Sequence, residues 1–230
     1  MFTLNFLNLD IGSFFRNFEL SKSSFSKVHK KHAAVFPQSH LTSNKEHQRV
    51  SAIFCENTHK YDGNSSKTGL VSDVGCSHFL DLFSACTKAN TRNILCSILH
   101  KRIKEIEALL YRFDFIAVPK EGNVLLADAL CQCSGKPILI VRSKPIRFDY
   151  PFEGDFQAGK NVLIVDDIGS DGNFLLNHIL TLRKFGAKVN AAICLVNRTD
   201  GNAEKILTDN KLSYYYLYSL NDDILQRATN

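Results

Sequence analysis

The chain has 230 residues, of which 44% are hydrophobic and 22% are charged, with a formal net charge of +5 at pH 7. This composition is ordinary for a soluble globular protein, and the length allows one good core but not two large domains. No run reaches the ~18 apolar residues that a membrane helix needs, so a membrane partner is not expected.

The first part of the chain has no clear helix or strand pattern. Residues 1–60 mix Ser, Asn, His and Lys with weak periodicity. We therefore predict an irregular N-terminal extension at 1–60 and one domain at 61–230. Residues 1–20 lack the basic start of a signal peptide, and Asp10 and Glu19 argue against a transit peptide. These features favour a cytoplasmic protein over one with an organellar address.

A basic stretch lies within this extension. Between Lys22 and Arg49 there are six Lys or Arg residues and one acid, Glu46. A nucleic-acid-binding arm would show such a charge, but no recognition motif accompanies it. A solvated linker is the favoured interpretation, and nucleic acid is not an expected partner.

The seven cysteines are odd in number and lack the spacing of a disulfide framework. Cys131 and Cys133 form a C-x-C pair, not the C-x-x-C pairs of a zinc site. Most of the cysteines lie in apolar stretches, where the free residue behaves as a small buried hydrophobe. A metal site built on cysteine is therefore not expected.

Regular elements are predicted from residue 91 onward. They are a helix at 91–112, a short apolar run at 113–119, a helix at 124–133, strands at 137–141 and 162–165, a helix at 174–185 that stops at Gly186, a strand at 188–196, a helix at 203–209 and a strand at 214–218. Apolar strands that alternate with helices indicate a parallel sheet covered on both faces. The predicted fold class is α/β, a doubly wound, mostly parallel sheet flanked by helices.

The most informative segment reads Asn161-Val-Leu-Ile-Val-Asp-Asp-Ile-Gly-Ser-Asp-Gly-Asn-Phe174. A buried strand delivers Asp166 and Asp167 to its carboxyl end, where ligands of open α/β sheets bind. A loop with Gly169 and Gly172 follows, and a helix is expected to begin near Asn173.

This segment has the features of an anion-binding loop next to two carboxylates. Backbone N–H groups of the loop and the first helical turn converge, and the helix dipole adds positive potential. Asp166 and Asp167 suit a ribose diol, or a Mg²⁺ ion shared with a pyrophosphate. The segment therefore predicts a ribose 5-phosphate site whose phosphate and ribose contacts come from Ile168, Gly169, Ser170, Asp171, Gly172 and Asn173.

Response-regulator receiver domains also begin with a Val-Leu-Ile-Val-Asp-Asp strand. In those domains the acidic pair lies on the first strand and a whole five-stranded domain follows it. Only 69 residues follow Asn161, which is too few for the ~100–120 residues of such a domain. A receiver domain is excluded.

Four segments resemble the type I phosphoribosyltransferases, and specifically their orotate phosphoribosyltransferase branch. Val162–Asn173 looks like the phosphoribosyl-diphosphate motif, in which a hydrophobic strand meets Asp-Asp and a Thr/Gly loop. Thr68–Asp81 is similar to the family's Leu-Lys-Ser-Gly-x-x-Ser-Pro-x-Tyr-Ile-Asp segment, and Val118–Ala127 to its Pro-x-x-Gly-Gly-Ile-Pro-Leu-Ala pyrophosphate loop. Val196–Gly201 matches the family's Val-Asp-Arg-x-x-Gly. Order and spacing agree over residues 68–225.

The resemblance implies an enzyme that transfers ribose 5-phosphate from phosphoribosyl diphosphate to a nitrogenous base such as orotate, as a homodimer. It implies catalytic roles for Asp166, Asp167, Arg142 and Lys144, with Mg²⁺ held at Asp166 and Asp167. It further implies pyrophosphate contacts from Lys120, Glu121 and Gly122, and a contact between Arg198 and a substrate carboxylate. His178 is expected to be a surface or packing residue, and His78 is expected to have a structural rather than a catalytic role.

Several positions depart from the family pattern. Asp73 stands where the family has a lysine that reaches the diphosphate, and Asp171 and Glu121 add acidic charge near expected phosphates. In the mobile loop, Arg142–Asp149 replaces Arg-Lys-Glu-x-Lys-x-His-Gly, with Ser143, Ile146 and Phe148 at basic positions, although Lys144 and Arg147 keep positive charge nearby. These departures leave open an alternative, a non-catalytic descendant that binds a phosphoribosyl ligand or supports a partner.

Overall fold

The computed structural model describes residues 43–60, 77–110, 112–143 and 150–229. Its centre is a sheet of six strands in the order β5-β4-β3-β6-β7-β8. The strands are β3 (Phe115–Pro119), β4 (Ile138–Val141), β5 (Phe152–Glu153), β6 (Asn161–Gly169), β7 (Lys188–Arg198) and β8 (Ser213–Leu220). All neighbours pair in parallel except β4 and β5. The predicted doubly wound, mostly parallel sheet is confirmed.

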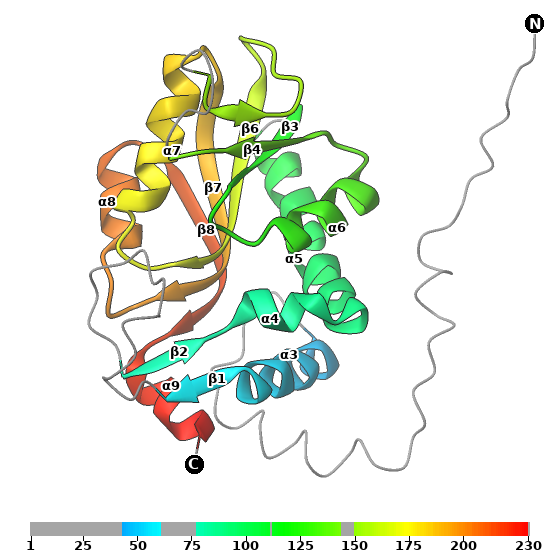
Figure 1. Cartoon of the computed structure of the whole chain (residues 1–230), viewed down its shortest axis with the longest axis vertical. Coiled ribbons are helices and arrows are strands. Elements are labelled where there is room, and N and C mark those ends of the chain that lie inside the picture. The colour runs from blue at the N-terminus through cyan, green and yellow to red at the C-terminus, as the bar shows by residue number, and fades with distance from the viewer. Residues whose placement is uncertain (1–42, 61–76, 111, 144–149, 230) are drawn as a thin grey trace, which may run out of the picture.

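Helices cover both faces of this sheet (Figure 1). Helices α5 (Ala89–Leu109) and α6 (Val124–Ser134) pack on one face, and α7 (Asn173–Lys184) and α8 (Ala203–Asp209) on the other. Along β6, Leu163 and Val165 belong to the core under α5 and α6, whereas Val162 and Ile164 belong to the core under α7. Successive strand residues point to opposite faces, so a strand with both faces covered is apolar throughout.

A smaller unit lies beside the carboxyl ends of the central strands (Figure 1). It contains the antiparallel pair β1 (Thr58–Lys60) and β2 (His78–Leu80), with helices α3 (Asn44–Glu56), α4 (Leu82–Thr87) and α9 (Asp222–Thr229). In the main sheet, the chain proceeds from β3 outward to β4 and from β6 outward to β8 on the other side. The switch point between β3 and β6 is where ligands of such folds bind, and this unit closes over it.

The expectation of irregular chain at 1–60 is wrong for residues 44–60. A capping box starts α3, since Ser43 accepts from the Glu46 N–H group and Glu46 accepts from the Ser43 N–H group. The apolar side of α3 is buried, and Phe54 packs edge-on against Tyr218 of β8 with ring centroids 5.2 Å apart. Residues 1–42 lie outside the described residues, so the extension there stays a prediction.

The predicted elements from residue 91 onward are all present, with ends shifted by a few residues. The helix predicted at 203–209 has those bounds, whereas β6 continues past Val165 to Gly169. Asp166 and Asp167 therefore lie within the last part of the strand, where Asp166 is the register partner of Cys194 on β7. In the described part of the chain, no helix is both long and apolar enough to span a bilayer.

Candidate active site

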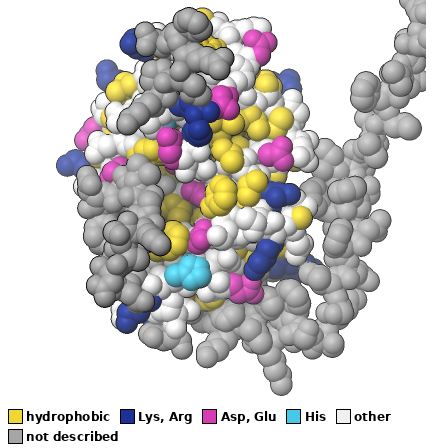
Figure 2. Space-filling view, in the orientation of Figure 1, with side chains coloured by type: hydrophobic (Ala, Val, Ile, Leu, Met, Phe, Trp, Pro, Cys, Tyr) yellow, Lys and Arg dark blue, Asp and Glu magenta, His cyan; other side chains and the backbone are white. Residues whose placement is uncertain are grey.

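A pocket of about 310 Å³ opens between the ends of β6 and β7 and the β2–α4 segment. Most of the predicted site residues line it, namely Glu121, Gly122, Asp166, Asp167, Ile168, Gly169, Ser170, Asp171, Gly172 and Arg198. Acidic and hydrophobic side chains are exposed together near the middle of the face shown in Figure 2. The fold thus brings together segments that are separated by up to about eighty residues in the sequence.

Asp166 and Asp167 form an acid pair at the floor of the pocket. Asp166 is 8% exposed, and its Oδ1 accepts from the Asp167 N–H group at 2.9 Å. Burial raises the pKa of Asp166, and the adjacent Asp167 charge raises it further. Burial also raises the pKa of Asp167, although the hydrogen bond from Asn123 opposes this shift. Both shifts show that the surrounding protein does not fully compensate the negative charge of the two carboxylates. Hydroxyl donors of a ribose, or a cation, would supply that compensation.

Asn123 supports the acid pair, and the sequence analysis missed it. Its Nδ2 donates to Asp167 Oδ2 at 3.1 Å and to the Leu82 carbonyl at 3.0 Å. Its Oδ1 accepts from the Leu126 N–H group and so caps α6. Asn123 therefore ties α4, α6 and β6 together. Its position directly before a predicted helix was the available signal, because asparagine is a favoured N-cap.

The loop from Gly169 to Asn173 leads from β6 into α7. Gly172 has φ 82°, and a Cβ there would lie 2.7 Å from the Ala203 Cα, so both the backbone angle and the close approach require glycine. Ser170 and Asp171 line the pocket, whereas Asn173 is exposed and is absent from its lining. The loop has the tight turn that the sequence predicted.

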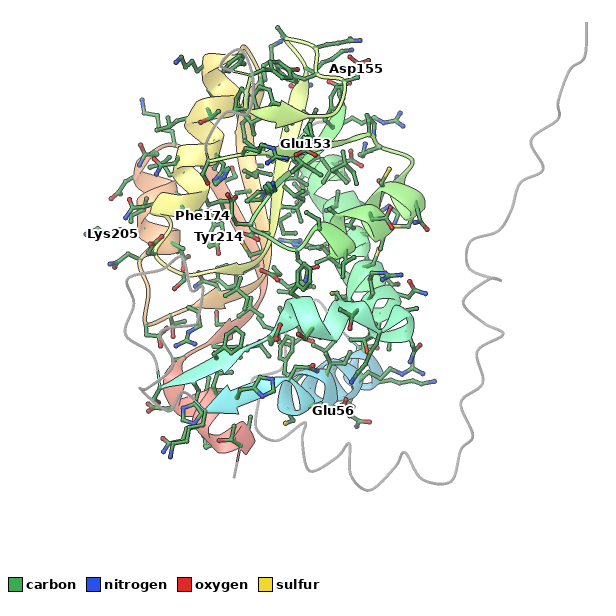
Figure 3. All side chains as sticks on the ribbon, viewed as in Figure 1. Glu56, Glu153, Asp155, Phe174, Lys205 and Tyr214 are labelled. Carbon is green, nitrogen blue, oxygen red and sulfur yellow. The ribbon has the colours of Figure 1, made fainter. Side chains whose placement is uncertain are left out.

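The start of α7, which the sequence analysis assigned to a phosphate, already carries a carboxylate. Asp171 Oδ1 accepts from the Asn173 N–H group at 2.9 Å and from the Phe174 N–H group at 3.4 Å. Phe174, at the first turn of α7, is labelled in Figure 3. An anion that used these two N–H groups would have to displace Asp171.

The loop after β3 approaches the acid pair from the other side of the switch point. A Cβ on Gly122 would lie 2.7 Å from Asp166 Oδ1, so a side chain at this position would force Asp166 to shift. Glu121 lines the pocket, and its Oε1 accepts from Ser143 Oγ at 3.2 Å. Lys120 is exposed and does not belong to the pocket lining. Of the three predicted pyrophosphate residues, the pocket therefore includes Glu121 and Gly122.

His178 on α7 is buried, as expected for a structural role. Its Nδ1 donates to the Phe174 carbonyl at 2.7 Å, and its Nε2 lies 3.3 Å from Ser143 Oγ and 3.7 Å from Glu121 Oε2. The side chain therefore connects α7 to the loops that follow β3 and β4.

Arg198, at the end of β7, is buried in the pocket wall and already has a carboxylate partner. Its Nε and Nη2 donate to Asp200 at 2.8 and 2.5 Å, and its Nη1 donates to the His78 carbonyl at 3.3 Å. The sequence analysis found Arg198 and missed Asp200, although the Arg-x-Asp spacing was visible. This two-point pairing is the geometry in which arginine binds a ligand carboxylate.

Arg142 and Lys144 are the two remaining predicted residues, and only Arg142 is among the described residues. Arg142, at the end of β4, forms an ion pair with Glu153 of β5, which is labelled in Figure 3. Arg142 instead lines a second hollow with Phe174 and His178. Lys144 lies outside the described residues, as do Asp73, Ile146, Arg147 and Phe148.

Comparisons with known proteins agree with this fold. No family model matches the chain. It is 30% identical over 139 residues to an orotate phosphoribosyltransferase of Pyrococcus horikoshii, a match that covers 60% of this chain and 73% of that protein. In structure it resembles a phosphoribosyltransferase of Corynebacterium diphtheriae (TM-score 0.63, 20% identity, 80% of this chain and 99% of that one). It also resembles an orotate phosphoribosyltransferase of Mycobacterium tuberculosis (TM-score 0.62, 17% identity, 81% of this chain and 94% of that one). The chain belongs to the orotate phosphoribosyltransferase family and has the type I phosphoribosyltransferase fold.

Proposed function

We propose that this protein transfers ribose 5-phosphate from phosphoribosyl diphosphate to orotate in pyrimidine nucleotide synthesis. The observation that carries the proposal is the single pocket that joins the acid pair, the glycine loop and Arg198. A ribosyl donor with a phosphate and a planar acceptor with a carboxylate need these three groups within one cavity. The matched relative is itself named an orotate phosphoribosyltransferase.

The acid pair is proposed to accept hydrogen bonds from the ribose hydroxyls. A Mg²⁺ ion also fits this position, because Mg²⁺ is usually held by one or two carboxylates together with substrate phosphates. Among the described residues, no cluster of three or more His, Cys, Asp or Glu residues can hold a metal ion by itself. Asp166 and Asp167 would thus hold Mg²⁺ only jointly with a ligand, and when bound the ion would offset charge on the diphosphate.

The base is proposed to lie between Arg198 and the β2–α4 segment. Phe79, Leu80 and Phe83 supply apolar pocket wall on that side, which suits a planar ring. An orotate carboxylate would replace Asp200 on the Arg198 guanidinium and keep the same two-point geometry. The Asp200 side chain is 28% exposed, so it borders solvent into which it can rotate.

The alternative, a protein that binds a phosphoribosyl ligand without turnover, has specific support. Asp171 occupies the first N–H groups of α7, and Glu153 engages Arg142, the arginine retained from the family's mobile loop. Transferases of this kind depend on positioning and on cations that stabilise the leaving group. A site with these competing carboxylates could bind its ligand and lack useful turnover.

Turnover by the full-length chain distinguishes the two functions. Orotate consumption is followed by absorbance with phosphoribosyl diphosphate and Mg²⁺, and the nucleotide product by chromatography. Asp167→Asn is expected to reduce turnover by at least ~10²-fold, as does loss of one preorganised catalytic group in other enzymes. Asp155→Asn, which alters an exposed acid in another loop, serves as the charge-matched control. Ligand binding without product would support the alternative, and absence of both would refute the two proposals together.

We also propose a cytoplasmic homodimer. The end of the long helix supports an interface, because Leu109 is 75% exposed and Leu110 42% exposed. Exposed apolar residues that cluster can form part of a surface that a partner covers. Sedimentation of the wild type and a Leu109→Glu/Leu110→Glu variant tests this point, and a wild-type monomer at all concentrations would contradict it.

A further inference from the structure

Two cysteines from different helices meet in the core between α5 and α6. Cys96 on α5 and Cys133 on α6 have their Sγ atoms 3.3 Å apart. Cys96 is 5% exposed, whereas Cys133 is half-buried. A disulfide bond is about 2.05 Å long, so closing the pair needs an approach of about 1.3 Å. Rotation of the two side chains, with a small shift of the helices, can supply that distance.

The surroundings give the two thiols different acidity. The contact with Cys96 lowers the pKa of Cys133, and the neighbouring His100 lowers it further. The same contact with Cys133, together with burial, raises the pKa of Cys96. His100 lies one helical turn after Cys96 on α5, so the two side chains share a face of the helix. Cys133 is therefore the nucleophile, because the thiolate is the reactive form of cysteine, and Cys96 is the partner thiol.

We propose that Cys96 and Cys133 form a reversible disulfide across α5 and α6 when the protein meets a hydroperoxide. The Cys133 thiolate attacks one peroxide oxygen, the O–O bond breaks and hydroxide leaves, which gives a sulfenic acid. The Cys96 sulfur then attacks the Cys133 sulfur, the S–O bond breaks and water leaves with the Cys96 proton. The two thiols together lose two electrons, and hydrogen peroxide is reduced to two waters. A small thiol reverses the bond by thiol–disulfide exchange.

Neither Cys96 nor Cys133 belongs to the residues that line the pocket. Cys86 on α4 is close enough to raise the pKa of Cys96, and Asn123 is close enough to act on Cys86, whose pKa it lowers against the larger effect of burial. Asn123 in turn donates to Asp167. The pair is thus separate from the ligand-contacting residues, so its oxidation can be measured whether or not the proposed activity is present.

The test uses the reduced full-length chain and one equivalent of hydrogen peroxide at neutral pH. Remaining thiols are blocked with iodoacetamide, and the tryptic peptides are sequenced by tandem mass spectrometry, because one tryptic peptide carries both Cys131 and Cys133. We expect peptides joined through Cys96 and Cys133, lighter by two hydrogens and separated again by dithiothreitol. Cys131→Ser is the matched control, since it removes a neighbouring half-buried cysteine of α6 and should leave the joining rate unchanged. Cys133→Ser should abolish joining, and His100→Gln should slow it several-fold.

The proposal is overturned if both thiols of the folded wild type are alkylated as fully after peroxide as before. It is also overturned if fragmentation of the joined peptides places the bond on other cysteines, such as Cys131, instead. Circular dichroism before and after treatment shows that the chain is folded. Should a cysteine variant fail to fold, the wild-type peptide map with the Cys131→Ser control still decides the question.

Discussion

Asp171 offers the sharpest test of how the phosphate loop works. Its carboxylate accepts from the Asn173 N–H group at 2.9 Å and from the Phe174 N–H group at 3.4 Å. The shorter contact has good geometry, and a hydrogen bond to a charged group contributes about 1.5–3 kcal/mol. The longer one adds little. A phosphate that takes these N–H groups must first break the shorter bond and then tolerate a neighbouring negative charge.

Replacing Asp171 with alanine should therefore tighten binding of a 5′-phosphate. Because Asp171 is partly exposed and solvent screens its charge, we take the lower end of that range, about 1.5 kcal/mol, which corresponds to slightly more than tenfold in affinity, or roughly 12-fold. The first N–H groups of α7 would lose their side-chain acceptor, which, by analogy with loss of an N-cap side chain, should cost about 1 kcal/mol of unfolding free energy. Asp171→Asn keeps a capping oxygen without the charge, so its gain in affinity should be smaller and its stability closer to wild type.

The assay is calorimetric titration with ribose 5-phosphate at low ionic strength. Asp155→Asn, which removes one exposed acid elsewhere, is expected to bind like the wild type. The reasoning is refuted if Asp171→Ala binds no better than Asp155→Asn. Weaker binding by Asp171→Ala would show that the carboxylate helps the ligand, by ordering the loop, more than it competes.

Three further predictions concern the acid pair, a buried ion pair and the base site. Asp166→Asn should abolish turnover yet raise the melting temperature at neutral pH, because burial and the adjacent Asp167 charge raise the pKa of Asp166 in the folded state. The folded state therefore binds the Asp166 proton more tightly than the unfolded state does. The difference in stability between the variant and the wild type should shrink as the pH falls towards the ordinary aspartate pKa. Glu107 lies 2.8 Å from Lys136; burial alone would raise the pKa of Glu107, but this partner lowers it overall. The unfolding free energy of the wild type should therefore fall as the pH drops through the folded-state pKa of Glu107. Glu107→Gln should cost about 3 kcal/mol in denaturant melts and remove this pH dependence. Asp200→Asn should lower the KM for orotate by about tenfold, because the orotate carboxylate would then displace a neutral amide from Arg198 rather than a charged carboxylate. A higher KM would mean instead that Asp200 orients Arg198.

The features that could be predicted from the sequence are those that depend on the order of apolar, acidic and glycine residues along the chain. The central strands are recognisable because they are buried on both faces and hence apolar throughout, as Val162–Val165 shows. The site at the end of β6 follows from two acids and a glycine loop at the carboxyl end of such a strand. The topology then brings Arg198, from the next strand, to the same edge of the sheet.

The features that the sequence analysis missed depend on contacts between distant or freely rotating side chains. Helix α3 has a mostly polar sequence, and its position depends on Phe54 meeting Tyr218, 164 residues later. Whether Asp171 turns towards the α7 N–H groups, or Asp200 towards Arg198, is a choice of rotamer that residue spacing does not determine. The meeting of Cys96 and Cys133 likewise depends on how two helices pack.

The most direct test of the account is a calorimetric titration of the full-length protein with phosphoribosyl diphosphate in the presence of Mg²⁺. The wild type and an Asp166→Asn/Asp167→Asn variant, shown to be folded by circular dichroism, are compared under the same conditions. The account predicts one saturable site in the wild type and no measurable binding in the variant. Equal binding by both proteins, or none by the wild type, would contradict the assignment of this pocket to a phosphoribosyl ligand.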